Sequence, residues 1–158
     1  MPIDKSELRR VMGHFATGVT IITTRDEGGR PFGLTANAVS SVSLVPPLML
    51  VCVDKNADTY PYFERSGVFT INILAEGQET LSRKFATSGI EKFAGIGHRT
   101  NELGCAVLDD AVGHLACRVV RAIDAGDHTI YLGEVDVADA GDGAPLLFFR
   151  GGYRKLGP

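Results

Sequence analysis

The residues best suited to chemistry in this sequence form a run of small polar side chains from Gly33 to Ser43. Read as one strand with a period of two, the run places four polar side chains on one face: Thr35, Asn37, Ser41 and Ser43. Small side chains would let a flat ligand reach the backbone, and the hydroxyls could donate to a phosphate. A solvated outer face would carry similar residues. The position of the run before a proline pair and an apolar strand favours a ligand site.

Two further segments combine groups that could meet a nucleotide. In Gly126-Asp127-His128 the glycine favours a turn, so an imidazole that titrates near neutral pH would project from a strand end. In Arg83-Lys84-Phe85-Ala86 the cations could meet a phosphate and the phenyl ring could cover a flat ligand. On spacing alone, a plain hairpin turn is the favoured explanation of the first segment. A solvated helix face with Phe85 in the core is the favoured explanation of the second.

Several catalytic classes lack their motifs in this sequence. The four histidines never fall at metal-binding spacing, and neither a Gly-x-Ser-x-Gly elbow nor a Gly-x-x-x-x-Gly-Lys-Ser/Thr phosphate loop occurs. The segment Gly95-Ile-Gly97-His-Arg-Thr100 starts like a dinucleotide fingerprint, but threonine replaces the third glycine and no strand or helix pattern flanks it. We therefore expect an ordinary loop there, and no metal site.

The charge and the apolar pattern of the sequence argue against nucleic acid and membrane as partners. The net charge is −3, and no cationic cluster is longer than a pair such as Arg9-Arg10. Nucleic-acid binders usually carry a basic stripe that neutralises phosphates, so no nucleic acid is expected as a partner. No secretory leader pattern and no membrane-length apolar run occurs, which favours a cytoplasmic protein without membrane contact. The three cysteines lack metal-site spacing and are expected to be free, partly buried thiols.

The local patterns predict a strand-rich chain with three short helices. Helices are expected at 4–14, 58–65 and 79–86, the first two capped by Asp4 and Asp58. Strands are expected at 19–25, 31–43, 48–54, 68–74, 114–122 and 128–138, with a last pair at 146–150 and 153–156 around Gly151-Gly152. Strand 48–54 is apolar enough to be buried on both faces, and 87–103 reads as loop. This pattern favours one mainly antiparallel barrel rather than a doubly wound fold.

Five segments occur in the order seen in one protein family: 15–20 (FATGVT), 33–48 (GLTANAVSSVSLVPPL), Phe85-Ala86, 126–128 (GDH) and 150–153 (RGGY). The chain resembles the short flavin reductases, the small components of two-component flavin-dependent monooxygenases. The resemblance runs from about Leu8 to Leu156. The length of 158 residues predicts a single domain over 1–158. The resemblance implies the FMN-binding split β-barrel fold, antiparallel and of Greek-key type, which is usually a homodimer. One departure is Val45, where the family often has an acidic residue.

The resemblance also implies the site. The residues that would line the flavin ring and its ribityl-phosphate are Thr35, Ala36, Asn37, Ser40 and Ser41. The residues implied on the ribityl and phosphate side are Asp54, Lys55, Thr59, Lys84, Phe85 and Ala86, with Phe15, Gly18 and Tyr153 as neighbours of the cleft. His128 would lie near the nicotinamide as the catalytic residue.

The activity implied is an NAD(P)H:flavin oxidoreductase that transfers a hydride from NADH or NADPH to FMN or FAD. The reduced flavin would serve a partner monooxygenase. The sequence leaves open which flavin and which nicotinamide are used, and whether the flavin is diffusible or prosthetic. A split-barrel electron carrier without nicotinamide turnover is the alternative, and a non-catalytic scaffold is a more distant one.

Overall fold

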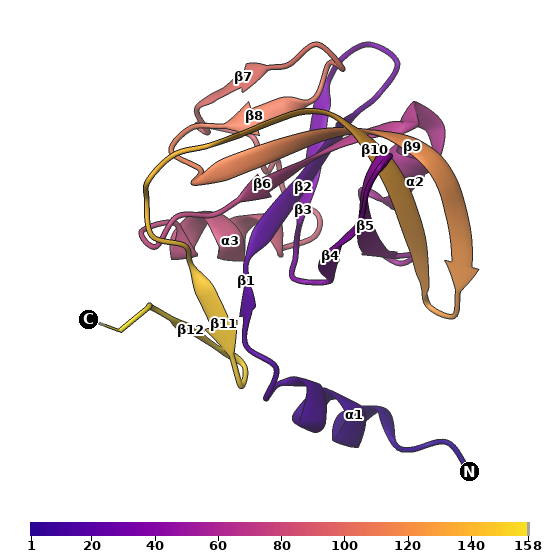
Figure 1. Ribbon diagram of the computed structural model, residues 1–158, viewed down its shortest axis with the longest axis vertical. Helices are drawn as coiled ribbons and strands as arrows, with labels where there is room; N and C mark the ends of the chain where they lie inside the picture. The colour runs from indigo at the N-terminus through magenta and orange to yellow at the C-terminus, as the bar shows by residue number, and fades with distance from the viewer. Residues whose placement is uncertain (158) are drawn as a thin grey trace.

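The computed structural model describes residues 1–157, which form a curled antiparallel sheet with three helices and a projecting arm (Figure 1). The helices are α1 (Lys5–Met12), α2 (Tyr60–Ser66) and α3 (Glu79–Phe85). The first strands are β1 (Thr17–Gly18), β2 (Thr20–Arg25), β3 (Pro31–Ala36), β4 (Val39–Leu44), β5 (Pro47–Asp54) and β6 (Val68–Ile73). The later strands are β7 (His98–Thr100), β8 (Ala106–Leu108), β9 (Gly113–Ala125), β10 (His128–Ala140), β11 (Leu147–Phe149) and β12 (Gly152–Arg154).

The main sheet has seven strands in the order β3-β2-β6-β9-β10-β5-β4. Its two edge strands, β3 and β4, are consecutive in the chain and are joined by Asn37 and Ala38 alone. The sheet must therefore curl until its edges approach each other, although they are not paired. This arrangement and the antiparallel register confirm the predicted mainly β fold class.

One predicted strand is wrong, because residues 31–43 form two strands on opposite edges of the sheet. β3 pairs with β2, whereas β4 pairs with β5. The chain leaves the first ladder at Asn37, and the Ala38 carbonyl accepts a hydrogen bond of 3.0 Å from the Cys52 backbone N–H. Thr35 and Ser41 consequently do not belong to one continuous strand face.

The core lies on both faces of β2, in which Thr20 to Thr24 are all buried. Because side chains alternate along a strand, Ile22 packs inside the curl with Phe69 and Tyr131, while Ile21 packs outside it with Phe85. α2 covers one opening of the curl through Phe63. α3 covers the outer face, where a Cβ at Gly33 would lie 3.0 Å from the Phe85 ring. Phe85 therefore belongs to the core.

The helices confirm most of the predicted ends. Asp4 caps α1 by accepting the Ser6 N–H at 2.7 Å, and Gly67 ends α2 with a φ of 68°. The predicted cap at Asp58 is wrong. Its carboxylate accepts the Gly89 N–H at 3.1 Å and the Lys92 ammonium at 3.2 Å instead. Asp58 therefore anchors the loop after α3 rather than the start of α2.

Two further expectations need correction. The segment 87–103 is mostly loop, as expected, but it contains the short strand β7, which pairs with β8. Strand β5 is buried on only one face, since Val51 and Val53 are inaccessible while Leu50 and Cys52 stay half-buried. The three cysteines are free, with Cys105 and Cys117 buried, as predicted.

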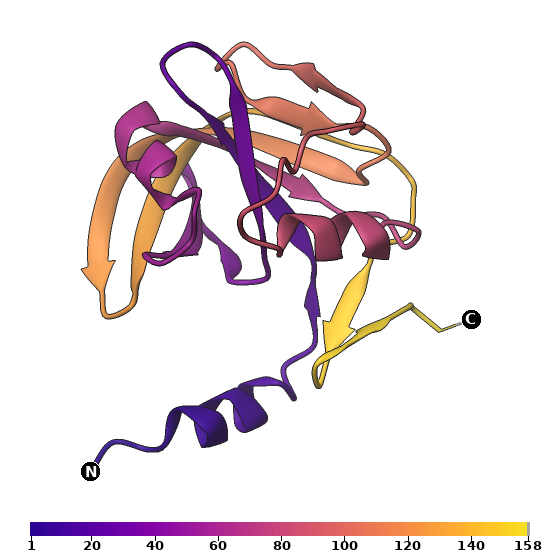
Figure 2. The ribbon, with the colours of Figure 1, turned by 180° about the vertical axis from the view of Figure 1, so that it is seen from behind.

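A small second sheet, β1-β11-β12, forms an arm below the main sheet and carries α1 beyond it (Figures 1 and 2). The turn of the β11–β12 hairpin is Arg150-Gly151, one residue earlier than the predicted Gly151-Gly152. Both turn residues have positive φ, which is the geometry that two-residue hairpins favour. This shift pairs Tyr153 with Phe148.

Candidate active site

A cleft of about 220 Å³, called the Tyr153 cleft below, opens where the arm meets the end of β3 and α3. Its lining residues are Val19, Thr35, Ala36, Asn37, Ser82, Ala86, Phe148 and Tyr153. The structure therefore brings together five of the predicted site residues: Thr35, Ala36, Asn37, Ala86 and Tyr153. Apolar side chains and small residues make the walls, and hydroxyl and amide groups make the rim. A flat ring with polar atoms along its edge fits such a cleft.

The polar rim of this cleft is held by a short chain of hydrogen bonds. The Thr35 hydroxyl donates to the Ser82 carbonyl at 2.6 Å, and the Ser82 hydroxyl bonds the Tyr153 hydroxyl at 2.7 Å. The Arg83 guanidinium lies over the Tyr153 ring at 4.9 Å, and Phe148 meets the same ring edge-on. These contacts fix the Tyr153 ring as one wall of the cleft.

Backbone groups at the turn between β3 and β4 remain free to bind a ligand. Among residues 1–157, the N–H groups of Asn37 and Ala38 donate no hydrogen bond, and the Asn37 amide is also without a partner. Unpaired backbone donors beside a partly apolar cleft are suited to the heteroatoms of a ring system. The residues present at this cleft therefore fit an isoalloxazine ring.

A second group of predicted residues lies at the tip of the β9–β10 hairpin. His128 begins β10 and is paired with Asp54 at the end of β5. Its Nδ1 bonds the Asp127 carboxylate at 2.7 Å, a hydrogen bond that lowers the pKa of Asp127. Lys55 bonds Asp124 and donates to the Gly126 carbonyl at 2.7 Å. This group does not line the Tyr153 cleft within the single chain.

Thr59 lies in a neighbouring cleft of about 270 Å³ between β3 and the loop after α3. Its hydroxyl is buried and has no hydrogen-bond partner among residues 1–157, which is rare for a polar atom. Lys92, which is 6% exposed, lines the same cleft and donates to Asp58 and to the Gly33 carbonyl. A phosphate-bearing group fits this combination.

The remaining predicted residues lie around these clefts rather than in them. Lys84 donates to the Ala94 carbonyl at 2.7 Å, and the Phe85 side chain is inaccessible, so only its backbone could meet a ligand. Ser40 and Ser41 are exposed at the start of β4. Gly18 pairs with Leu147, and Phe15 is 70% exposed beside α1.

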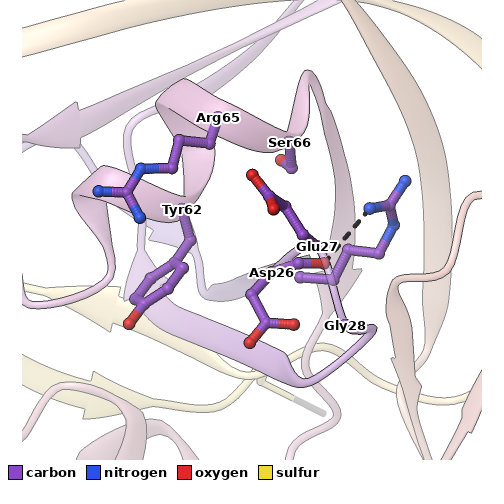
Figure 3. Close-up of a pocket in the computed structure, with 7 residues that line it drawn as sticks. Asp26, Glu27, Gly28, Tyr62, Arg65 and Ser66 are labelled. Atoms are coloured by element: carbon purple, nitrogen blue, oxygen red, sulfur yellow. Dashed lines mark hydrogen bonds between the residues drawn. The ribbon is translucent and has the colours of Figure 1, made fainter.

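A polar cleft of about 330 Å³ lies elsewhere, between the β2–β3 turn and α2 (Figure 3). The turn contributes Asp26 and Glu27, and the helix contributes Tyr62 and Arg65. The Arg25 Nε donates to the Leu103 carbonyl at 2.8 Å, so this cation holds the neighbouring loop. Charged side chains of both signs line this cleft, so it suits a flat, partly apolar ring less well than the Tyr153 cleft does.

Comparison with known proteins identifies the family of the chain. The family model described as "Flavin reductase like domain" matches residues 12–157. The chain belongs to this family. It is therefore a flavin reductase, and the predicted resemblance is confirmed. The match includes both the Tyr153 cleft and the hairpin tip that carries His128.

The relatives of this flavin reductase have consistent names. The chain is 42% identical over 157 residues to the reductase component of a 4-nitrophenol 4-monooxygenase/4-nitrocatechol 2-monooxygenase from Rhodococcus opacus, covering 99% of this chain and 84% of the relative. It is 39% identical over 163 residues to an NADH-dependent FAD reductase from Streptomyces globisporus, covering 99% and 88%.

Solved structures share the fold. Nitrilotriacetate monooxygenase component B from Mycobacterium thermoresistibile superposes with a TM-score of 0.93 at 40% identity, covering 98% of this chain and 88% of that one. The Streptomyces globisporus NADH:FAD oxidoreductase SgcE6, solved with NAD and FAD fragments, gives a TM-score of 0.92 at 39% identity, covering 98% and 94%. These neighbours confirm the predicted fold class.

Sequence reasoning missed three residues that line the flavin reductase's cleft: Val19, Ser82 and Phe148. A signal existed for Ser82, which lies one helical turn before Phe85 and Ala86 on the same predicted helix. Phe148 was hidden because its position opposite Tyr153 depends on the register of the β11–β12 turn.

Within residues 1–157, no cluster of three His, Cys, Asp or Glu side chains is arranged to hold a metal ion. None of the described helices has the length and apolar character needed to cross a membrane.

Proposed function

We propose that this flavin reductase oxidises a reduced nicotinamide nucleotide and passes the hydride to FMN or FAD. The observation that carries the proposal is the Tyr153 cleft, whose partly apolar walls and unpaired N–H groups at Asn37 and Ala38 fit a flavin ring. When bound, the flavin supplies the chemistry by accepting the hydride. The protein contributes the binding and alignment of two flat rings in contact.

The predicted residues in and around the Tyr153 cleft have separate parts in this proposal. Thr35, Asn37 and the neighbouring backbone hold the ring edge, while Tyr153 and Phe148 hold its side. Lys84, Ala86 and the unpartnered Thr59 hydroxyl serve the ribityl-phosphate portion. Lys55 and Asp54 orient the hairpin tip next to His128.

His128 is proposed to contact the nicotinamide. Because a carboxylate can only accept, Nδ1 is the donor in the bond to Asp127, and Nε2 is left for the cofactor. A fixed tautomer lets the ring bind the carboxamide or stack on the pyridine ring. No acid or base is required for hydride transfer itself, so the imidazole acts by positioning the reductant.

We also propose that the flavin reductase works as a homodimer that supplies reduced flavin to a monooxygenase. Leu44 and Val45 are 89% and 92% exposed, and Leu8, Val11 and Met12 of α1 are each about half exposed. Apolar surface of this extent favours contact with a second copy. The names of the Rhodococcus and Mycobacterium relatives support the partner monooxygenase.

The alternative is a flavin-binding electron carrier that does not turn over a nicotinamide. His128→Ala separates the two. Under our proposal, this change raises the KM for NADH or NADPH about tenfold, as expected for the loss of one strong contact of about 1.4 kcal/mol, and leaves flavin affinity unchanged. His98→Ala, on the distant strand β7, is the control. An equal loss of flavin binding in His128→Ala would favour the carrier.

A further inference from the structure

A cationic cleft of about 390 Å³ lies between the end of α1 and the β11–β12 turn. Its lining residues are Arg9, Arg10, Gly13, His14, Arg150 and Gly151, so no acidic residue lines it. The sequence contributes the cationic pair Arg9-Arg10, and the fold adds Arg150 from the other end of the chain. None of these residues belongs to the clefts assigned above.

Two of the three guanidinium groups in this cleft are free. Glu7 accepts two hydrogen bonds from Arg10, at 2.7 and 2.8 Å, and neutralises it. Arg9 and Arg150 make no side-chain hydrogen bond or ion pair within residues 1–157. Arg9 and Arg150 are therefore the two guanidinium groups of this cleft that remain free to donate to an anion from outside the chain.

Arg150 has a backbone conformation that is unfavourable for a non-glycine residue. Its φ is +50°, and Gly151 follows at +75°, as in a type I′ turn. Asn, Asp or Gly would adopt this conformation more easily than arginine does. The Arg150 N–H donates to the Gly13 carbonyl at 2.8 Å, which ties the turn to α1.

His14 completes the cleft with an oriented imidazole. Its Nδ1 lies 2.9 Å from the Arg10 carbonyl, and because a carbonyl only accepts, Nδ1 is the donor. The ring meets Phe149 edge-on, with centroids 6.3 Å apart. Nε2 is therefore the ring nitrogen without a partner.

The cleft lies between the two parts of the proposed active site. Arg150 is two residues beyond Phe148 of the Tyr153 cleft, a separation of about 7 Å along a strand. On the other side, α1 extends below the sheet towards the β9–β10 hairpin tip (Figures 1 and 2). The Arg9 charge adds to the hydrogen bond from His128 in lowering the pKa of Asp127.

We propose that this cleft binds the pyrophosphate of the nicotinamide dinucleotide, with Arg9 and Arg150 as its main ligands. The proposal rests on the nicotinamide turnover proposed above. In such a cofactor only a ribose separates the nicotinamide from the pyrophosphate, which matches the short step from the Tyr153 cleft to Arg150. The planar guanidinium group suits paired phosphate oxygens. NADH and NADPH share this group, so the cleft serves either.

The test uses Arg150→Asn and Arg9→Gln in the full chain. Asparagine tolerates the left-handed backbone at position 150, so this variant removes the guanidinium and keeps the turn. Arg99→Gln is the matched control, because Arg99 is another exposed arginine without an ion pair, on the distant strand β7. The measurements are KM for NADH, KM for flavin and kcat, together with direct titration of NADH onto flavin-free protein.

We expect Arg150→Asn and Arg9→Gln each to raise the KM and the dissociation constant for NADH about tenfold, the range for a charge-assisted hydrogen bond. Flavin KM and kcat should stay near wild type, and Arg99→Gln should change nothing. Inorganic pyrophosphate should compete with NADH in the wild type and much less in the variants.

Three results would overturn the assignment. Unchanged NADH affinity in both variants would show that the cleft does not bind the pyrophosphate. A rise in flavin KM alone would assign the cleft to the flavin's own phosphate. An equal loss of NADH affinity in Arg99→Gln would show that the variants act through the overall charge of the protein rather than through this cleft. Absence of any flavin reduction by the wild type is a different outcome, because it would remove the proposed function itself.

Discussion

The shape of the Tyr153 cleft depends on a single side-chain group, the Tyr153 hydroxyl. It bonds the Ser82 hydroxyl, and Ser82 is fully buried, so this is the only place where that side chain is satisfied among residues 1–157. Thr35 then bonds the Ser82 carbonyl. One hydroxyl thus connects the arm, α3 and β3 at the point where the flavin ring is proposed to bind.

We predict that Tyr153→Phe weakens flavin binding about fivefold, because losing a neutral hydrogen bond of about 1 kcal/mol frees the ring and leaves Ser82 without a partner. Flavin fluorescence quenching measures this constant. Thr100→Val is the control, since it removes an exposed hydroxyl that makes no hydrogen bond in the described chain, on the distant strand β7. Equal affinities for both variants and the wild type would show that the rim does not position the ring.

Single residues were predictable from the sequence only where their role is local. The Asp4 cap and the Gly67 stop depend on neighbours within one helical turn, and both are confirmed. Asp58 looked like a cap by the same rule. It instead binds Gly89 and Lys92, about thirty residues away, and no local pattern reports such a contact.

Strand β10 is the element that places His128, because it pairs with β5 on one side and β9 on the other. Its register with β9 shifts between Leu132 and Gly133. Gly133 is buried where a Cβ would lie 2.6 Å from the Phe69 ring and 2.7 Å from the Cys117 Cβ. The close approach of β10 to the core therefore requires glycine at this position.

We predict that Gly133→Ala lowers the free energy of unfolding by about 1–3 kcal/mol through overpacking. Thermal melting measures it as a fall of about 2–4 °C per kcal/mol for a chain of this size. Gly77→Ala provides the control, because a Cβ there meets no atom within 4 Å and its φ is not positive. A Gly133→Ala protein as stable as the control would contradict the packing described for β10.

Helices and strands could be predicted from periodicity and turn residues. The errors arose where pairing with a strand far away in the sequence determines the extent of a strand. The β-branched run that forms β2 and the long strands β9 and β10 follow local propensity. The run 31–43 has the same local character, yet its halves pair with strands on opposite edges of the sheet. The register of β11 and β12 likewise depends on a turn with Arg150 in a left-handed conformation.

In the whole molecule, the single chain leaves apolar side chains exposed at several places, including the β4–β5 turn and α1. Leu44 and Val45 stand out at the β4–β5 turn, and α1 buries none of its residues. The predicted fold class followed from the strand-rich pattern, and the site residues followed from resemblance. The way the chain separates the Tyr153 cleft from His128 could not be predicted, because it depends on how the whole sheet curls.

We predict that the protein sediments as a dimer and that Leu44→Lys shifts it towards the monomer, because burying an unpaired ammonium in an interface is costly. Sedimentation velocity over a range of concentrations measures this shift. Ile90→Lys, which places the same charge on the half-exposed loop after α3, should leave the dimer intact. A monomeric wild type at high concentration would exclude the proposed assembly.

The central claim, that this chain reduces flavin with a nicotinamide, is tested most directly by one anaerobic experiment. The purified protein is mixed with a large excess of FMN or FAD, NADH or NADPH is added in turn, and flavin absorbance is followed. We predict that one pairing bleaches flavin far beyond one equivalent of protein, which identifies both substrates. If flavin binds and yet no pairing bleaches it, nicotinamide turnover is excluded and the chain is an electron carrier.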